Sequence, residues 1–204
     1  MTLPFEADDG KLVGSRHILQ SQNVEEAPER VNRPVPVPSV YSDERGEIHN
    51  LLICGRRRIN LLFSKAGVKR SGDIHADTQH DFVFSGTVQV STLHSDGSTQ
   101  TKSYGPYQYI AIPPYTPHIF HFTQDTVMAE WWDGAFHAWF YTPYRKLVQE
   151  SFRSLVPGRF SHYIVAENDN VTSGSHTAAE FQQKLWWTGL LLGLSIGFLL
   201  GRRK

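Results

Sequence analysis

Short runs rich in apolar and β-branched residues, separated by turn signals, dominate the chain between residues 47 and 133. Among the turn signals are Asp96-Gly97, Gly105-Pro106 and Pro113-Pro114. A helical period of useful length first follows at residues 144–156. Short strands at this spacing are typical of a sandwich or a barrel. The pattern therefore predicts an all-β body with a short helix packed at its end.

The pattern changes on both sides of this body. Prolines recur through residues 28–40, and a segment of that composition cannot join a central strand. We therefore expect an extended arm over residues 1–40 and the barrel with its terminal helix over residues 41–160. Residues 161–184 are polar and rich in Ser, Thr, Asn and Gly, which predicts a flexible tether.

Residues 185–201 carry no charge and are apolar on every face of a helix. The pair Trp186-Trp187 at one end and the basic residues 202–204 at the other suit the two interfaces of a membrane. The span of roughly 24 Å is short for a hydrocarbon core of about 30 Å. A buried core helix is the alternative, but it should show a polar face. Because the first residues lack an apolar signal segment, we expect a tail-anchored membrane protein with a cytosolic domain, in the mitochondrial outer membrane or the ER.

Charge and small residues restrict the partners. Basic and acidic residues balance at 20 each without a basic stripe, so we expect no nucleic-acid partner. The single cysteine, Cys54, cannot form an internal disulfide, which fits a reducing compartment. Glycines recur every fourth residue from Gly189 to Gly201, and the strand pattern around Val83 is apolar on both faces. Both features favour a homodimer.

Metal-capable side chains gather between Gly67 and Gly86. Asp73, His75 and Gln79 share parity, so on an extended chain they point to the same face, whereas His80 points to the other. With His118 they offer two imidazoles and one carboxylate, a donor set that suits iron(II), manganese or zinc. A metal site is the favoured interpretation. A metal-free pocket and an ordinary polar strand edge are the alternatives.

The spacing of these residues resembles the first motif of the cupin superfamily, G-x5-H-x-H-x3-E-x6-G, with Asp73 in place of the first His and Gln79 in place of the Glu. The segment "PPYTPH" resembles the second motif, P-x-G-x2-H, with Tyr115 at the Gly and His118 at the ligand position. The resemblance covers about residues 41–139. It implies a double-stranded β-helix, or jelly-roll barrel. "YSDERGEIHNLL" and "IAIPPYTPHIFHF" also look like segments of the sugar-nucleotide 3,5-epimerases of the same fold.

Two other polar groups have an ordinary interpretation. Residues 55–60, "GRRRIN", read as a solvated hairpin rather than an anion site. Residues 130–133, "EWWD", read as core packing rather than the mouth of a pocket.

Three functions follow as hypotheses. The first is a membrane-tethered cupin enzyme, an oxygenase or isomerase, that acts on a small molecule through a divalent metal held by Asp73, His75 and His118. Gln79 would orient water or substrate there, and Tyr115 is a candidate catalytic acid. The second is a non-catalytic cupin that binds a small ligand. The third is a metal-free sugar isomerase or epimerase, with His75 as proton acceptor and a tyrosine as donor.

Overall fold

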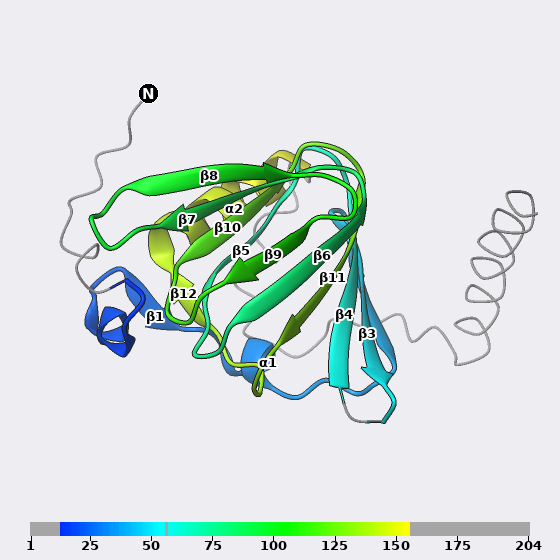
Figure 1. Ribbon diagram of the computed structural model, residues 1–204, viewed down its shortest axis with the longest axis horizontal. Helices are drawn as coiled ribbons and strands as arrows, with labels where there is room; N and C mark the ends of the chain where they lie inside the picture. Colours follow the sequence, from blue (N-terminus) through cyan, green and yellow to red (C-terminus); the bar gives the residue numbers. More distant parts are fainter. Residues whose placement is uncertain (1–12, 56, 156–204) are drawn as a thin grey trace, which may run out of the picture. The chain divides into compact units, whose positions relative to one another are not determined.

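The computed structural model describes residues 13–55 and 57–155, whose strands form two sheets (Figure 1). The first sheet has the order β1-β12-β5-β10-β7-β8. Its strands are Val24–Glu26 (β1), Trp139–Tyr141 (β12), Lys69–Ile74 (β5), His118–Phe122 (β10), Val88–Leu93 (β7) and Thr99–Tyr104 (β8). The second has the order β2-β3-β4-β11-β6-β9. Its strands are Ser39–Asp43 (β2), Gly46–Ile53 (β3), Arg57–Ser64 (β4), Thr126–Trp132 (β11), Gln79–Ser85 (β6) and Tyr109–Ile112 (β9).

The eight strands from β4 to β11 have the order of a jelly roll. They pair as β4-β11-β6-β9 in one sheet and as β5-β10-β7-β8 in the other, and every pair is antiparallel. Eight strands in two such sheets make the double-sheet jelly roll. The expected all-β architecture is therefore confirmed.

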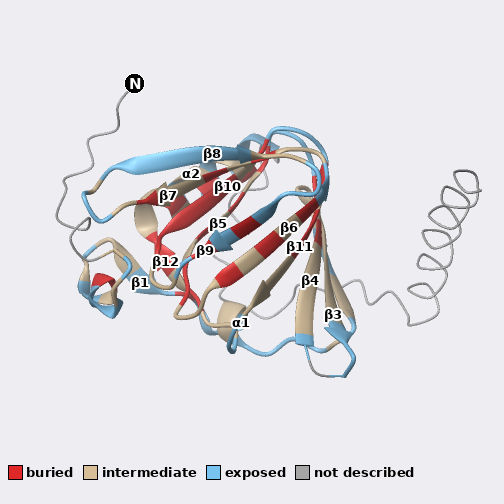
Figure 2. Cartoon of the chain, in the orientation of Figure 1, coloured by how far each residue is buried: buried red, intermediate tan, exposed pale blue. Residues whose placement is uncertain are grey.

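The core lies between the inner faces of the two sheets. Strand residues alternate between the faces, so every second side chain is buried, as β6 shows with Gln79, Asp81 and Val83. Figure 2 shows this alternation as red and tan segments along β6 and β7. The buried apolar side chains of this core come from both sheets: Leu62, Val68, Val83, Val88, Val90, Ile110, Ile112, Phe120, Phe122 and Met128.

A second apolar cluster covers the outer face of the first sheet. The helix α2 (Thr142–Leu155) places Tyr144, Val148 and Phe152 on one buried face, four residues apart. Tyr144 and Val148 pack with Ile74 of β5 and with Ile18 of the 3₁₀ helix η2 (Arg16–Gln20). The helix expected at residues 144–156 is therefore present, beginning two residues earlier.

The segment expected as an extended arm is extended only in part. It contains η2, the strand β1 and the short helix α1 (Glu29–Asn32), and β1 pairs with β12. The Asn32 side chain holds Ala138 at both backbone groups, accepting from its N–H at 2.8 Å and donating to its carbonyl at 3.1 Å. Two-sided pairing of this kind needs residues distant in sequence, so the local proline pattern could not predict it.

The tether at 161–184 and the anchor at 185–201 lie outside the described residues. Within residues 13–55 and 57–155, no helix is both long and apolar enough to cross a bilayer. The structure holds one chain, so the homodimer stays a prediction. Of the two-sided apolar strand expected around Val83, this residue is buried in the core, while Phe84 is 44% exposed.

Candidate functional site

A bulge in β5 decides which side chains of this strand enter the barrel. The register with β10 shifts between the pair His118↔Asp73 and the pair Ile119↔Ser71, so Gly72 is the extra residue. Ser71 and Gly72 both have positive φ, at 71° and 85°. Because of the extra residue, Arg70 and Asp73 both face inward although they are three positions apart.

Two imidazoles form the centre of the site. His75 and His118 are 4% and 1% exposed, and their ring centroids lie 5.5 Å apart. In each ring Nδ1–H donates to a backbone carbonyl, that of His137 at 2.8 Å and that of Thr116 at 3.0 Å. The lone pair of each neutral ring therefore lies on Nε2.

Burial keeps both imidazoles neutral. It lowers the pKa of His118 to about 4, with the neighbouring His75 as the second cause. Burial also lowers the pKa of His75, although Asp73 nearby acts in the opposite direction. At neutral pH each ring is thus a proton acceptor or a potential ligand, but not a cation.

Ser71 links one imidazole to a carboxylate. Its Oγ lies 3.0 Å from His118 Nε2 and 3.2 Å from Asp73 Oδ2. A hydroxyl has one proton, so it donates to only one of these two acceptors at a time. The other carboxylate oxygen, Asp73 Oδ1, is buried without a hydrogen-bond partner.

Two inward-facing carboxyl groups, the buried Asp81 and the half-buried Glu130, lie on the second sheet. The Gln79 side-chain amide donates to both oxygens of Asp81 at 3.3 Å and to Glu130 Oε1 at 3.1 Å, and Asn60 donates to Glu130 Oε2 at 3.1 Å. Burial raises the pKa of Glu130 to about 7. Burial, and then the neighbouring Glu130, raise the pKa of Asp81 well above its ordinary value. The pair therefore retains a proton near neutral pH.

The structure brings together most of the residues that the sequence singled out. His75 and His118 are in contact, and Asp73 reaches His118 through Ser71. Gln79 faces inward as expected, but its amide nitrogen holds the carboxyl pair.

Tyr115 packs elsewhere, against the second apolar cluster on the outer face of the first sheet. Its φ of 56° lies in the left-handed region that favours glycine, the residue that the cupin motif has at this position. His80 faces outward, where it stacks with Trp131 and Tyr109 and pairs with Asp133 at 2.9 Å.

Four further polar residues face inward without having been expected from the sequence: Asn60, Arg70, Ser71 and Asp81. Asp81 has the same strand parity as the buried Val83, and Asn60 has that of the buried Leu62, so parity alone could have found them. The inward orientation of Arg70 and Ser71 together depends on the bulge, and Gly72 is its only indication in the sequence.

The donor set suits a divalent metal chemically, but the arrangement does not. Asp73 Oδ1 and Gln79 Oε1, at two of the four ligand positions of the cupin motif, are buried oxygens without partners. In residues 13–55 and 57–155, however, no three His, Cys, Asp or Glu side chains are arranged to hold a metal ion.

Inward-facing side chains carry four buried polar atoms without hydrogen-bond partners. Two are donors, Arg70 Nη2 and Trp132 Nε1, and two are acceptors, Asp73 Oδ1 and Gln79 Oε1. Buried polar groups in folded proteins are nearly always paired. Trp132 and Phe136 also pack their rings on His75, with centroids 5.3 Å from it. The interior therefore has unused donors and acceptors beside an aromatic wall.

No family model and no curated protein matches the chain. Among solved structures, a complex of CapF with the inhibitor 3-isopropenyl-tropolone is similar at 18% identity and a TM-score of 0.46, over 50% of this chain and 33% of that one. The capsular polysaccharide assembling protein CapF from Staphylococcus aureus is similar at 19% identity and a TM-score of 0.45, over 50% and 32%. A mutant of the Bacillus subtilis oxalate decarboxylase is similar at 13% identity and a TM-score of 0.46, over 52% and 30%. The matched part is about half of this chain and about a third of each solved chain.

Proposed function

We propose that the barrel interior binds a small polyhydroxylated molecule and transfers a proton on it by acid–base catalysis, as a metal-free isomerase or epimerase does. The observation that carries this proposal is the set of four unpartnered buried atoms on Arg70, Asp73, Gln79 and Trp132. A hydroxyl both donates and accepts, so hydroxyl groups are suitable partners for the donors as well as for the acceptors among these atoms. Membrane tethering and the cupin assignment stand beside this as expectations from the sequence.

The titratable groups supply both partners of a proton transfer. His75 is a neutral base whose Nε2 carries the lone pair, and the carboxyl pair Asp81–Glu130 retains a proton. Opposite pKa displacements of this kind mark acid and base roles in enzymes. In the proposed step His75 takes the proton from a carbon next to a carbonyl. The electron pair of that C–H bond forms the C=C bond of an enol, and the protonated carboxyl gives its proton to the former carbonyl oxygen.

A ligand screen tests the binding. Sugars, sugar acids, polyols and sugar nucleotides are each added to the full chain, and the melting temperature is measured. For every compound that raises it, titration calorimetry then measures the affinity. We expect Asp73→Ala and Trp132→Phe each to weaken binding by about tenfold, because each removes one hydrogen-bonding atom from the interior. Trp139→Phe is the matched control, because Trp139 packs in the second apolar cluster. Equal loss in the control and in Trp132→Phe would place the ligand outside the barrel.

Exchange with deuterated water tests the chemistry on any ligand found. We expect the wild-type chain to incorporate deuterium at the carbon next to the carbonyl, and His75→Gln to reduce the rate by about a hundredfold or more. NMR spectroscopy of the ligand measures both. Tight binding without any exchange would leave a binding protein and remove the enzyme.

The second candidate is a divalent metal held by Asp73, His75 and His118, favoured by the unpartnered oxygens of Asp73 and Gln79. If the ion binds, Gln79→Glu should increase affinity for iron(II), manganese or zinc by adding a carboxylate, and His118→Ala should decrease it by at least tenfold. Titration with each metal, followed by elemental analysis, measures this. If wild type and Gln79→Glu both remain without metal, the candidate is wrong.

A further inference from the structure

The hairpin formed by β3 and β4 extends beyond the second sheet. These strands pair with one another from Gly46↔Ser64 to Ile53↔Arg57. The β2 ladder stops at Asn50, and the β11 ladder stops at Asn60. We call residues 51–55 and 57–59 the β3–β4 finger, which Figure 1 shows projecting past the ends of the neighbouring strands. Two strands without further neighbours are at best marginally stable in water.

The finger exposes aliphatic side chains. Leu52 and Ile53 are 46% and 47% exposed, and as successive strand residues they point to opposite faces. Val35, itself 37% exposed, is joined to the finger through its carbonyl, which accepts from Arg58 Nη2 at 3.0 Å. The finger therefore exposes aliphatic surface on both of its faces. The position of Leu52 and Ile53 beyond the sheet leaves them without a core of their own.

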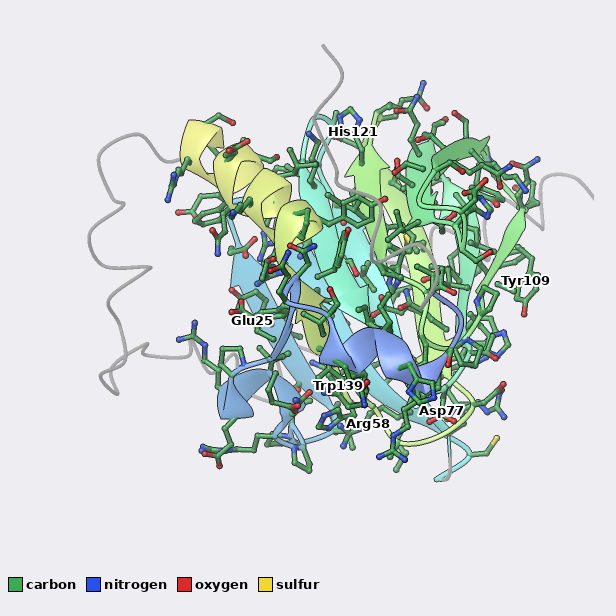
Figure 3. All side chains as sticks on the ribbon, turned by 90° about the vertical axis from the view of Figure 1, so that its left-hand side faces the viewer. Glu25, Arg58, Asp77, Tyr109, His121 and Trp139 are labelled. Carbon is green, nitrogen blue, oxygen red and sulfur yellow. The ribbon has the colours of Figure 1, made fainter. Side chains whose placement is uncertain are left out.

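The same finger is cationic. Arg57 pairs opposite Ile53, and Arg58 pairs opposite Leu52, so each exposed aliphatic residue has a guanidinium-bearing neighbour across the ladder. The chain has no Asp or Glu from Leu51 to Ile59. Within the described residues, neither arginine forms an ion pair. In Figure 3, Arg58 lies at the end of the domain opposite to His121.

We infer that the β3–β4 finger docks on an anionic lipid bilayer. Leu52 and Ile53 enter the acyl boundary, and Arg57 and Arg58 contact lipid phosphates. A nucleic acid or an acidic protein groove would neutralise the arginines but leave the aliphatic pair in water, and an apolar groove would do the reverse. A bilayer surface offers phosphate and hydrocarbon within the length of one side chain. This contact differs from the expected anchor and goes beyond the proposed activity of the barrel.

The single cysteine provides the test, because Cys54 is exposed at the turn of the finger. The full chain is labelled there with a polarity-sensitive fluorophore and mixed with vesicles of phosphatidylcholine, with or without 30% phosphatidylserine. We expect a blue shift, and quenching by brominated acyl chains, on the anionic vesicles. The lipid concentration for half the shift should rise about fivefold for Arg57→Ser, and further when Arg58→Ser is added. Leu52→Ser with Ile53→Ser should abolish the quenching.

The controls separate this contact from other sources of the signal. In a Cys54→Ser background, a label at Ser95→Cys, in the exposed and polar β7–β8 turn, should not shift on the same vesicles. Soluble glycerophosphoserine at equal phosphate concentration should not shift the Cys54 label either. An equal shift on vesicles without phosphatidylserine would overturn the proposal. So would a shift that grows with protein concentration in the absence of lipid, because that indicates self-association of the finger.

Discussion

Gly72→Ala is expected to lower the free energy of unfolding by about 3 kcal/mol, since the left-handed backbone alone costs about 1–3 kcal/mol. Gly72 has φ of 85°, and a Cβ built there lies 2.9 Å from the backbone nitrogen of Arg145 and 3.0 Å from its Cα. Those atoms belong to α2, whose Arg145 also donates to the Ser71 carbonyl at 2.8 Å. The substituted methyl group would therefore strain the bulge and push the helix from the sheet.

Two other glycines separate these causes. Gly67 has φ of 81° but open space around a built Cβ, so Gly67→Ala should show backbone strain alone, about 1 kcal/mol. Gly105 has open space and no positive φ, so Gly105→Ala should remain within about 0.5 kcal/mol of wild type. Urea unfolding of the three variants measures the series. If Gly72→Ala and Gly67→Ala are equally destabilised, the close approach of α2 is not what requires glycine.

The second large effect is a pH dependence with two opposite arms. Burial raises the pKa of Glu130 from 4.5 to about 7, so the folded chain holds a proton that the unfolded chain releases. The free energy of unfolding should therefore fall as pH rises through that range. Burial lowers the pKa of His118 from 6.5 to about 4, so the unfolded chain takes up a proton that the folded chain refuses. The contribution of His118 to the free energy of unfolding therefore falls as pH decreases from 6.5 to about 4.

Variants isolate each arm. As pH rises from about 4.5 to about 8, the free energy of unfolding of Glu130→Gln should increase by about 3 kcal/mol relative to that of wild type, because one unit of pKa shift corresponds to about 1.4 kcal/mol. As pH falls from about 7 to about 4, the free energy of unfolding of His118→Gln should increase by a similar amount relative to that of wild type. Urea unfolding at a series of pH values measures both. If the free energy of unfolding has the same pH dependence in Glu130→Gln as in wild type, then Glu130 is ionised in the folded chain and cannot act as the proposed acid.

Strand periodicity was sufficient to predict an all-β sandwich or barrel, whereas the jelly-roll order was implied only by the cupin resemblance. The runs from residue 47 onward became strands because apolar residues at every second position fill the space between two sheets. His75, Gln79 and His118 lie inside and His80 outside, as expected. Shared parity over residues 73–80 presumes one extended strand, however, whereas β5 ends at Ile74 and β6 of the other sheet begins at Gln79.

What the sequence did not show depends on contacts between distant residues. The run around Gly86 reads as one strand, yet a turn divides it into β6 and β7. The role of Gln79 depends on Glu130, which β11 brings opposite β6. Parity cannot reveal which buried carboxyl an amide will meet, and a motif position does not state which oxygen stays unpaired.

The Ser71 hydroxyl can donate its single proton to either Asp73 or His118, and the change from one to the other requires no backbone movement. When the hydroxyl turns to Asp73, the His118 nitrogen is open to a ligand, and when it turns to His118, the carboxylate oxygen is open instead. Such a rotation is among the fastest motions of a side chain. A ligand hydroxyl arriving on either side therefore finds an acceptor. Under the proposed function, this rotation would serve both the substrate and the product of an epimerase, because the two differ only in the configuration of one carbon.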